Sequence, residues 1–400
     1  MQAWSTPAWY GGNRVTISKR LKSFYPMLGS MILALSIVGC GGQTNSSGGS
    51  STSGVDLTYV TAQIDKYKSQ PTFMPPGPAF DASKAKGKLI FNIPFSSELP
   101  FNKITDDTMA TVAKQAGVQF INYSNQGQPS QQLQGIQTAI ARKADLIFLE
   151  GAPDPALFGP QLMAAHNAGI PVVVSHFYDA SQSPPGNLPP LVVIPARHNE
   201  ASRLEADYAI RENKGNVHAL IISANEISPS RGMVAAIQDE FKARCGSSCT
   251  TTVVDVAVPD FSTKVQSEVQ SALVRDPKIN YVIPFIDGLT QFAAPGILAA
   301  GRSKQVKIVS YNGSAFVLKM IQDHNIVSAD IGEDLLRLGY SNMDQALRVL
   351  SGAEPVKKEA YALRVWDSSN VNATGTPPDQ TAGYGNDFIQ GFPKLWGLQT

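Results

Sequence analysis

The stretch Tyr281–Gly313, YVIPFIDGLTQFAAPGILAAGRSKQVKIVSYNG, contains a strand, a helix and a second strand, with a polar residue at the end of each strand. The first apolar run stops before Asp287, where a helix can begin. Apolar residues then recur at helical spacing until Gly301, and a second apolar run stops before Asn312. We therefore predict that Asp287 and Asn312 lie at the carboxyl ends of two adjacent parallel strands. Open α/β sheets bind ligands at that edge.

The same alternation of strands and helices extends through most of the chain. The predicted strands are Leu89–Ile93, Val118–Tyr123, Leu146–Leu149, Pro171–Ser175, Leu191–Ile194, Val217–Ile222, Thr251–Val256, Tyr281–Ile283, Val306–Ser310, Ile326–Ile331 and Tyr361–Trp366. Helices are predicted at about 104–116, 129–143, 155–168, 199–213, 229–243 and 262–275, and at Asp334–Leu350. A proline-rich break, Pro184–Pro190, separates two similar series. This pattern predicts an α/β fold of two lobes with parallel sheets and a ligand crevice between them.

The composition is that of a globular chain with ordinary charge. Of 400 residues, 43% are hydrophobic and 16% are charged, which suffices to bury the cores of two domains. The formal net charge is +1, and the sequence has no lysine-arginine cluster or RNA-binding motif. We therefore expect neither a nucleic acid nor an acidic partner.

The amino terminus has the pattern of an export signal. Basic residues precede an apolar segment, Met27–Gly39, that is too short to span a bilayer comfortably. It ends in Ile37-Val38-Gly39-Cys40, which resembles a bacterial lipoprotein signal, and a Gly/Ser-rich spacer follows. We predict a signal peptide at 1–39 and a flexible tether at 40–54, lipidated on Cys40. The alternative is a plain signal peptide with an incidental cysteine.

Two further cysteines, Cys245 and Cys249, are separated by three residues in a predicted loop. In an exported chain this spacing favours a local disulfide, with two free thiols as the alternative. A zinc site is not expected, because none of the five histidines lies close in sequence.

Several short motifs follow one another between Lys88 and Trp366. They are Pro100-Phe101, Gln128-Pro129-Ser130-Gln131-Gln132, Ala168-Gly169-Ile170-Pro171-Val172, Arg231-Gly232, Asp260-Phe261, Asp287-Gly288 and Tyr311-Asn312-Gly313. In this order they resemble the ribose-type (type I) periplasmic binding proteins of ABC transporters. The resemblance implies two Rossmann-like lobes joined by three crossover strands, near Pro195, Glu333 and Ala360, that close on a ligand by a hinged motion.

These crossovers define the expected domain limits. Lobe 1 would comprise residues 88–195 plus 334–359, and lobe 2 residues 196–333 plus 360–366. A lead-in segment, 55–87, would pack on the surface before lobe 1, and a C-terminal extension, 367–400, would follow lobe 2.

The family's ligand contacts, carried over to the matching motifs, give an expected site. Phe101 and Phe261 would be aromatic walls against apolar faces of the ligand. Hydrogen bonds to its polar groups would come from Glu150, Ser175, His176, Arg231, Asp287, Asn312 and Glu333. At Glu150, Ser175-His176, Asn312 and Glu333 the sequence departs from the sugar-binding pattern, so the resemblance leaves the identity of the ligand open.

Structural roles are alternatives for most of these residues. Glu150 could be a solvated loop carboxylate and His176 a structural histidine. Arg231 could be a first-turn helix residue, and the two phenylalanines could belong to the core. Asp287 could cap the helix that follows it while also facing the crevice.

The resemblance implies a lipid-anchored, extracytoplasmic solute-binding protein that works without a cofactor. It would be a monomer, touch the membrane only through its lipid, and deliver a sugar, polyol or related molecule to an ABC transporter permease. An alternative is a sensory protein that presents its ligand to a chemoreceptor or sensor kinase. An enzyme is not expected, because the sequence has no GxSxG, HExxH or Walker motif and no GxGxxG after a strand. A transcriptional regulator would need an amino-terminal helix-turn-helix, which is absent.

Overall fold

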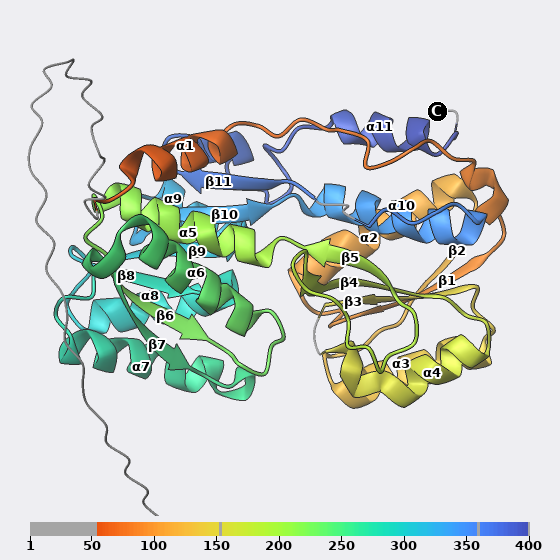
Figure 1. Cartoon of the computed structure of the whole chain (residues 1–400), viewed down its shortest axis with the longest axis horizontal. Coiled ribbons are helices and arrows are strands. Elements are labelled where there is room, and N and C mark those ends of the chain that lie inside the picture. Colours follow the sequence, from red (N-terminus) through yellow and green to blue (C-terminus); the bar gives the residue numbers. More distant parts are fainter. Residues whose placement is uncertain (1–53, 152–153, 358–360, 399–400) are drawn as a thin grey trace, which may run out of the picture. The chain divides into compact units, whose positions relative to one another are not determined.

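The computed structural model describes residues 54–151, 154–357 and 361–398 (Figure 1). The predicted signal peptide, the tether up to residue 53 with Cys40, and the crossover residue Ala360 lie outside the described residues. None of the helices in the described part of the chain is long and apolar enough to cross a lipid bilayer.

The first sheet has five parallel strands in the order β2-β1-β3-β4-β5. Their bounds are Leu89–Pro94 for β1, Gln119–Asn122 for β2, Leu146–Glu150 for β3, Val172–Asp179 for β4 and Val192–Ala196 for β5. Every residue of β3 and β4 is buried, as expected where helices cover both faces of a parallel sheet. Figure 1 shows α2 (Pro100–Ala116) and α10 (Leu335–Ser351) on one face, and α3 (Pro129–Ala141) and α4 (Gly159–Asn167) on the other.

The second sheet has six strands in the order β11-β10-β9-β8-β6-β7, and only β11 runs antiparallel. Their bounds are His218–Ser223 for β6, Thr250–Asp255 for β7, Tyr281–Pro284 for β8, Lys307–Asn312 for β9, Val327–Glu333 for β10 and Leu363–Asp367 for β11. Helix α5 (His198–Glu212) packs against α6 (Ser230–Arg244), and α7 (Phe261–Arg275) packs against α8 (Asp287–Ala299). A ninth helix, α9 (Ala315–Gln322), connects β9 to β10.

The predicted fold class is confirmed, and so is the predicted strand-helix-strand unit at Tyr281–Gly313. Strands β8 and β9 are parallel neighbours, with Tyr281 opposite Lys307. Asp287 and Asn312 therefore lie at the same carboxyl edge, as the sequence pattern predicts.

Three elements near the carboxyl edges differ from the prediction. Helix α2 begins at Pro100 rather than near residue 104, because proline suits the first helical position although the apolar period starts later. Strand β4 continues beyond Ser175 to Asp179 through an irregularity in which His176 has φ 63°. Helix α9 was not predicted, because a segment of eight residues is too short to show the helical spacing of apolar residues clearly.

The lead-in segment and the C-terminal extension contribute to the cores, whereas the sequence suggested a surface lead-in. Helix α1 (Leu57–Lys68) packs on α5 and buries Val60 and Ile64 fully. Helix α11 (Asp387–Leu395) packs on α10, and the adjacent Trp396 is fully buried. The two segments meet where the rings of Phe73 and Phe392 lie 4.9 Å apart.

A disulfide joins Cys245 and Cys249, whose Cα atoms are 5.7 Å apart. It closes the short connection between α6 and β7.

Candidate functional site

A cavity of about 670 Å³ lies at the carboxyl ends of the strands of both sheets. Phe95 follows β1 and Gly151 follows β3, the two strands at which the order of the first sheet reverses. From the second sheet, Phe285 follows β8 and Asn312 ends β9. This is the position at which doubly wound sheets hold ligands, and the volume is within the usual range for small-molecule pockets.

His176 is the central side chain of the cavity floor. Its φ of 63° is rare for a residue with a side chain, and the backbone irregularity in β4 turns the imidazole into the cavity. The centroid of its imidazole ring lies 5.1 Å from the ring centroid of Phe101, 5.1 Å from that of Tyr361 and 5.4 Å from that of His198. Asn312, with φ 133°, is a second cavity residue in strained backbone. Strain of this kind concentrates at functional sites.

His198 forms the floor from the second lobe. Its Nδ1 atom lies 3.2 Å from the hydroxyl of Tyr311, which also lines the cavity. Burial, with a smaller contribution from the neighbouring imidazole of His176, lowers the pKa of His198 to about 4, so the His198 imidazole is neutral at physiological pH.

A hydrogen-bonded network at the crossovers supports the floor. Tyr361 donates its hydroxyl proton to Glu333 Oε1 at 2.8 Å and accepts from the backbone N–H of Arg197 at 3.2 Å. Glu333 Oε2 lies 3.5 Å from His176 Nε2. Arg197 follows β5, Glu333 ends β10 and Tyr361 precedes β11, so the network joins chain segments that run between the lobes.

Glu150 and Ser175, two of the predicted ligand residues, lie beneath the cavity with protein partners. Glu150 is buried and accepts from Thr105 Oγ1 at 2.8 Å, from Asn342 Nδ2 at 3.0 Å and from Asn102 Nδ2 at 3.2 Å. Burial raises the pKa of Glu150. Ser175 donates its hydroxyl to Asn342 Oδ1 at 2.9 Å.

Asp287 is likewise engaged by its own lobe. It accepts from Ser310 Oγ at 2.5 Å and from the backbone N–H of Ser314 at 2.7 Å. Beside it, burial and the charge of Asp287 raise the pKa of Asp330 well above its usual range. Asp330 accepts from the backbone N–H of Gly313 at 2.8 Å. The two carboxyl groups thus hold the turn that follows Asn312.

The structure brings Phe101, His176 and Asn312 together in the cavity, with Glu333 directly behind His176. It does not bring Arg231 or Phe261 there. Arg231 is exposed in the first turn of α6, and Phe261 packs partly buried against the core of the second lobe.

Sequence reasoning missed several cavity residues. Asn102 directly follows the Pro100-Phe101 motif, and Tyr311 is the first residue of the Tyr311-Asn312-Gly313 motif. Both could therefore have been predicted as cavity residues from these motifs. Gln380 reaches the cavity from the C-terminal extension, where no motif marked it.

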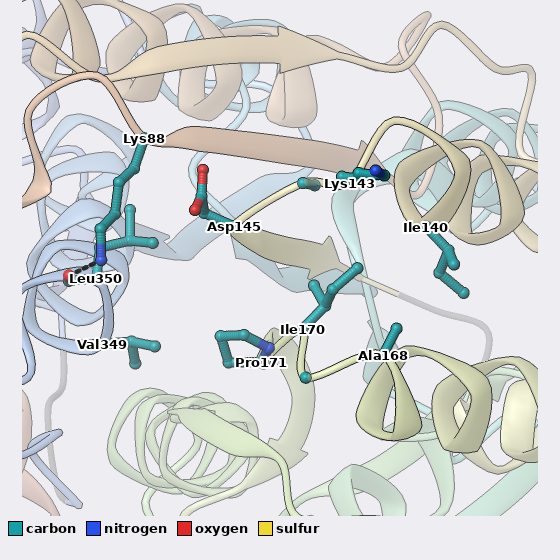
Figure 2. Close-up of a pocket in the computed structure, with 11 residues that line it drawn as sticks. Lys88, Ile140, Lys143, Asp145, Ala168, Ile170, Pro171, Val349 and Leu350 are labelled. Carbon is teal, nitrogen blue, oxygen red and sulfur yellow. Dashed lines mark hydrogen bonds between the residues drawn. The ribbon is translucent and has the colours of Figure 1, made fainter.

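A second cavity, of about 690 Å³, lies at the opposite edge of the first sheet (Figure 2). Lys88 precedes β1 and donates to the carbonyl of Leu350 at 2.7 Å, as Figure 2 shows. Asp145 precedes β3 and accepts from the backbone N–H of Leu89 at 2.8 Å. These polar groups make structural hydrogen bonds between chain segments at the amino ends of the strands. Open α/β sheets bind their ligands at the carboxyl ends instead.

Buried carboxyl groups predict that stability falls as pH rises toward neutrality and levels off above about pH 8. Burial raises the pKa of Asp106 and of Asp334 to about 7, and burial with the charge of Glu240 raises that of Asp207 to about 8. Because the folded chain binds these protons more tightly, their stabilisation is complete below about pH 4. It declines by up to about 1.4 kcal/mol per pH unit for each group between about pH 4 and the pKa of the folded state, and it is lost above about pH 8. His198 has the opposite effect, because its lowered pKa makes stability rise with pH. This rise is already complete above about pH 6.5, the ordinary pKa of histidine.

We therefore expect the melting temperature to fall from about pH 6.5 to about pH 8 and to level off above that pH. Asp207→Asn should flatten this fall, because the amide cannot ionise. A melting temperature that rises steadily over this range would contradict the prediction.

Comparison with known proteins agrees with this geometry. A periplasmic binding protein domain family matches residues 90–354. The chain therefore belongs to this family of solute-binding proteins, which are extracytoplasmic and not enzymes. In sequence the chain matches no curated protein.

Solved structures of solute-binding proteins share the fold. One from Agrobacterium vitis, with bound allitol, has a TM-score of 0.63 at 18% identity over 72% of this chain and 98% of its own. One from Thermotoga lettingae, in complex with 5-methylthioribose, has a TM-score of 0.64 at 17% identity over 77% and 99%. A carbohydrate transporter from Acidothermus cellulolyticus, in complex with myo-inositol, has a TM-score of 0.58 at 22% identity over 72% and 97%.

Proposed function

We propose that this protein captures a sugar or sugar-like small molecule between its two lobes and delivers it to the permease of an ABC transporter. The observation that carries the proposal is the cavity at the carboxyl ends of both sheets, with His176 and Asn312 in strained backbone at its surface. The sugars and polyols held by the similar solved structures support it.

In this proposal the predicted site residues have different roles. Phe101, His176 and Asn312 contact the ligand, and Glu333 orients His176. Glu150, Ser175 and Asp287 act indirectly, by fixing the loops and helices that line the cavity. Arg231 and Phe261 are not part of the binding surface, so replacing either with alanine should change ligand affinity little.

The test is a thermal-shift screen of the full chain with pentoses, hexoses, polyols, amino sugars and nucleosides, followed by calorimetric titration. A ligand at a thousandfold excess over its Kd should stabilise the protein by about 4 kcal/mol. His176→Gly should abolish most of the shift. No shift with any compound in the panel would refute the proposal.

A gene-deletion experiment distinguishes transport from sensing. If the protein serves transport, deleting its gene should abolish uptake of the identified ligand. Retained uptake with a lost behavioural or transcriptional response would instead support presentation to a chemoreceptor or sensor kinase.

We further propose that the protein is anchored to the membrane through lipid on Cys40, as the motif Ile37–Cys40 and the spacer after it suggest. Cys40→Ser should move the protein from the membrane fraction to the soluble fraction, or stall it as an unprocessed precursor. Processed, membrane-bound protein from this variant would show that the anchor lies elsewhere.

A further inference from the structure

The lining of the cavity between the lobes is dominated by uncharged side chains. Among the described residues that line it there is no aspartate, glutamate, lysine or arginine. Ionised side chains make the strongest hydrogen bonds to ligand groups. An anionic ligand would find no lysine or arginine side chain on this surface, and a cationic ligand would find no carboxylate.

Apolar side chains instead cover the surface on both sides of the cavity. Leu99 and Phe101 lie at the start of α2 in the first lobe, and Ile286 and Phe316 lie at the starts of α8 and α9 in the second. Leu99 and Phe316 each keep 41% of their surface exposed. Exposing these apolar side chains to water is unfavourable, and a ligand with apolar surface of its own would cover them.

The polar part of the cavity is concentrated at its floor. The Nδ1 atom of His176 and the Nε2 atom of His198 are buried without a hydrogen-bond partner, and both rings line the cavity, whereas Nε2 of His176 faces Glu333 Oε2 at 3.5 Å. Buried polar atoms are normally paired, so these two unpaired nitrogens call for donors or acceptors from a ligand. A hydroxyl group can serve as both, which matches imidazoles whose protons can occupy either nitrogen.

From these observations we infer that the ligand is an uncharged compound with a hydroxylated head and a bulky aryl or alkyl substituent. The head bonds to His176 and His198, and the substituent lies between Leu99 and Phe101 on one side and Ile286 and Phe316 on the other. The inference rests on the proposed function, and narrows its ligand class from sugars in general to sugars or polyols with an apolar group.

Calorimetric titration of the full chain with matched compounds tests the class. One set is ribose, 5-methylthioribose and ribose 5-phosphate; the other is glucose, phenyl β-glucoside and glucose 6-phosphate. In at least one set the apolar derivative should bind at least tenfold more tightly than both the parent sugar and the phosphate. If parent sugars or phosphates bind as tightly as the derivatives, the inference is overturned while the proposed function stands. If neither these compounds nor any pentose, hexose or polyol binds, both fail.

Two variants test the placement of the two ends. Phe316→Ser should reduce the preference for the apolar derivative to less than about threefold and leave the parent sugar's affinity unchanged. Ile389→Ser is the matched control, because Ile389 is a 42% exposed apolar residue on α11 that does not line the cavity, and it should change neither. His176→Gly accepts the positive φ and removes the imidazole, so it should weaken derivative and parent alike by at least tenfold without lowering the melting temperature. Equal weakening of both compounds by Phe316→Ser, or unchanged binding in His176→Gly, would overturn the placement.

Discussion

Replacing Asp344 with alanine is expected to lower the free energy of unfolding by about 3–5 kcal/mol, because it leaves a buried guanidinium without its counter-ion. Arg348 and Asp344 lie one turn apart on α10, with Arg348 Nε 2.7 Å from Asp344 Oδ2 and side chains only 1% and 0% exposed. Asp344 Oδ1 also accepts from Trp396 Nε1 at 2.7 Å. The Arg348 guanidinium donates to the carbonyl of Pro78 at 3.1 Å and lies over the ring of Phe80. One carboxylate thus ties α10 to both the lead-in segment and the C-terminal extension.

Urea unfolding of the full chain measures this effect. The matched control is Asp107→Ala, which removes an ion pair of the same spacing to Lys103 on α2, where both side chains are about 70% exposed; it should cost less than about 1 kcal/mol. The double variant Asp344→Leu with Arg348→Met should recover a large part of the loss, because neither charge is then buried alone. A cost for Asp344→Ala no larger than that of the exposed control would show that the pair does not hold the segments together.

Replacing Glu150 with alanine is expected to cost about 3 kcal/mol of stability and, in addition, to weaken ligand binding. The side-chain amides of Asn102 and Asn342 would lose their acceptor on Glu150 in a dry interior, whereas the Thr105 hydroxyl could still donate to backbone carbonyls. Each unpaired donor costs about 1–3 kcal/mol before the site relaxes. Asn102 lines the cavity, so its release should reduce affinity by roughly tenfold, the equivalent of about 1.4 kcal/mol.

Paired melting and titration measurements separate this role from direct contact. Glu150→Gln keeps an acceptor oxygen in place and should retain more stability than the alanine variant. If Glu150→Ala melts like the wild type but no longer binds ligand, then Glu150 contacts the ligand itself, as the family resemblance implies.

The order of the elements, the parallel sheets and the edge that carries the cavity could all be predicted from the sequence. These follow from local periods: short apolar runs stop at polar residues, and helices of ordinary length separate them. Because parallel strands connected by helices end at one edge, the sequence pattern is sufficient to place Asp287 and Asn312 on the same side of the sheet.

Which of the residues at this edge face the cavity depends on tertiary packing and could not be predicted from the sequence. Glu150 and His176 both follow apolar runs, but Glu150 turns beneath α2 to three donors, whereas the irregularity in β4 turns His176 outward. A strand's last side chain can point to either face, and a local backbone distortion changes the choice without a mark in composition. The floor also joins Arg197, Tyr361 and Glu333, which are far apart in sequence. Contacts of that range depend on how the segments between the lobes pack, and no local pattern of residues encodes them.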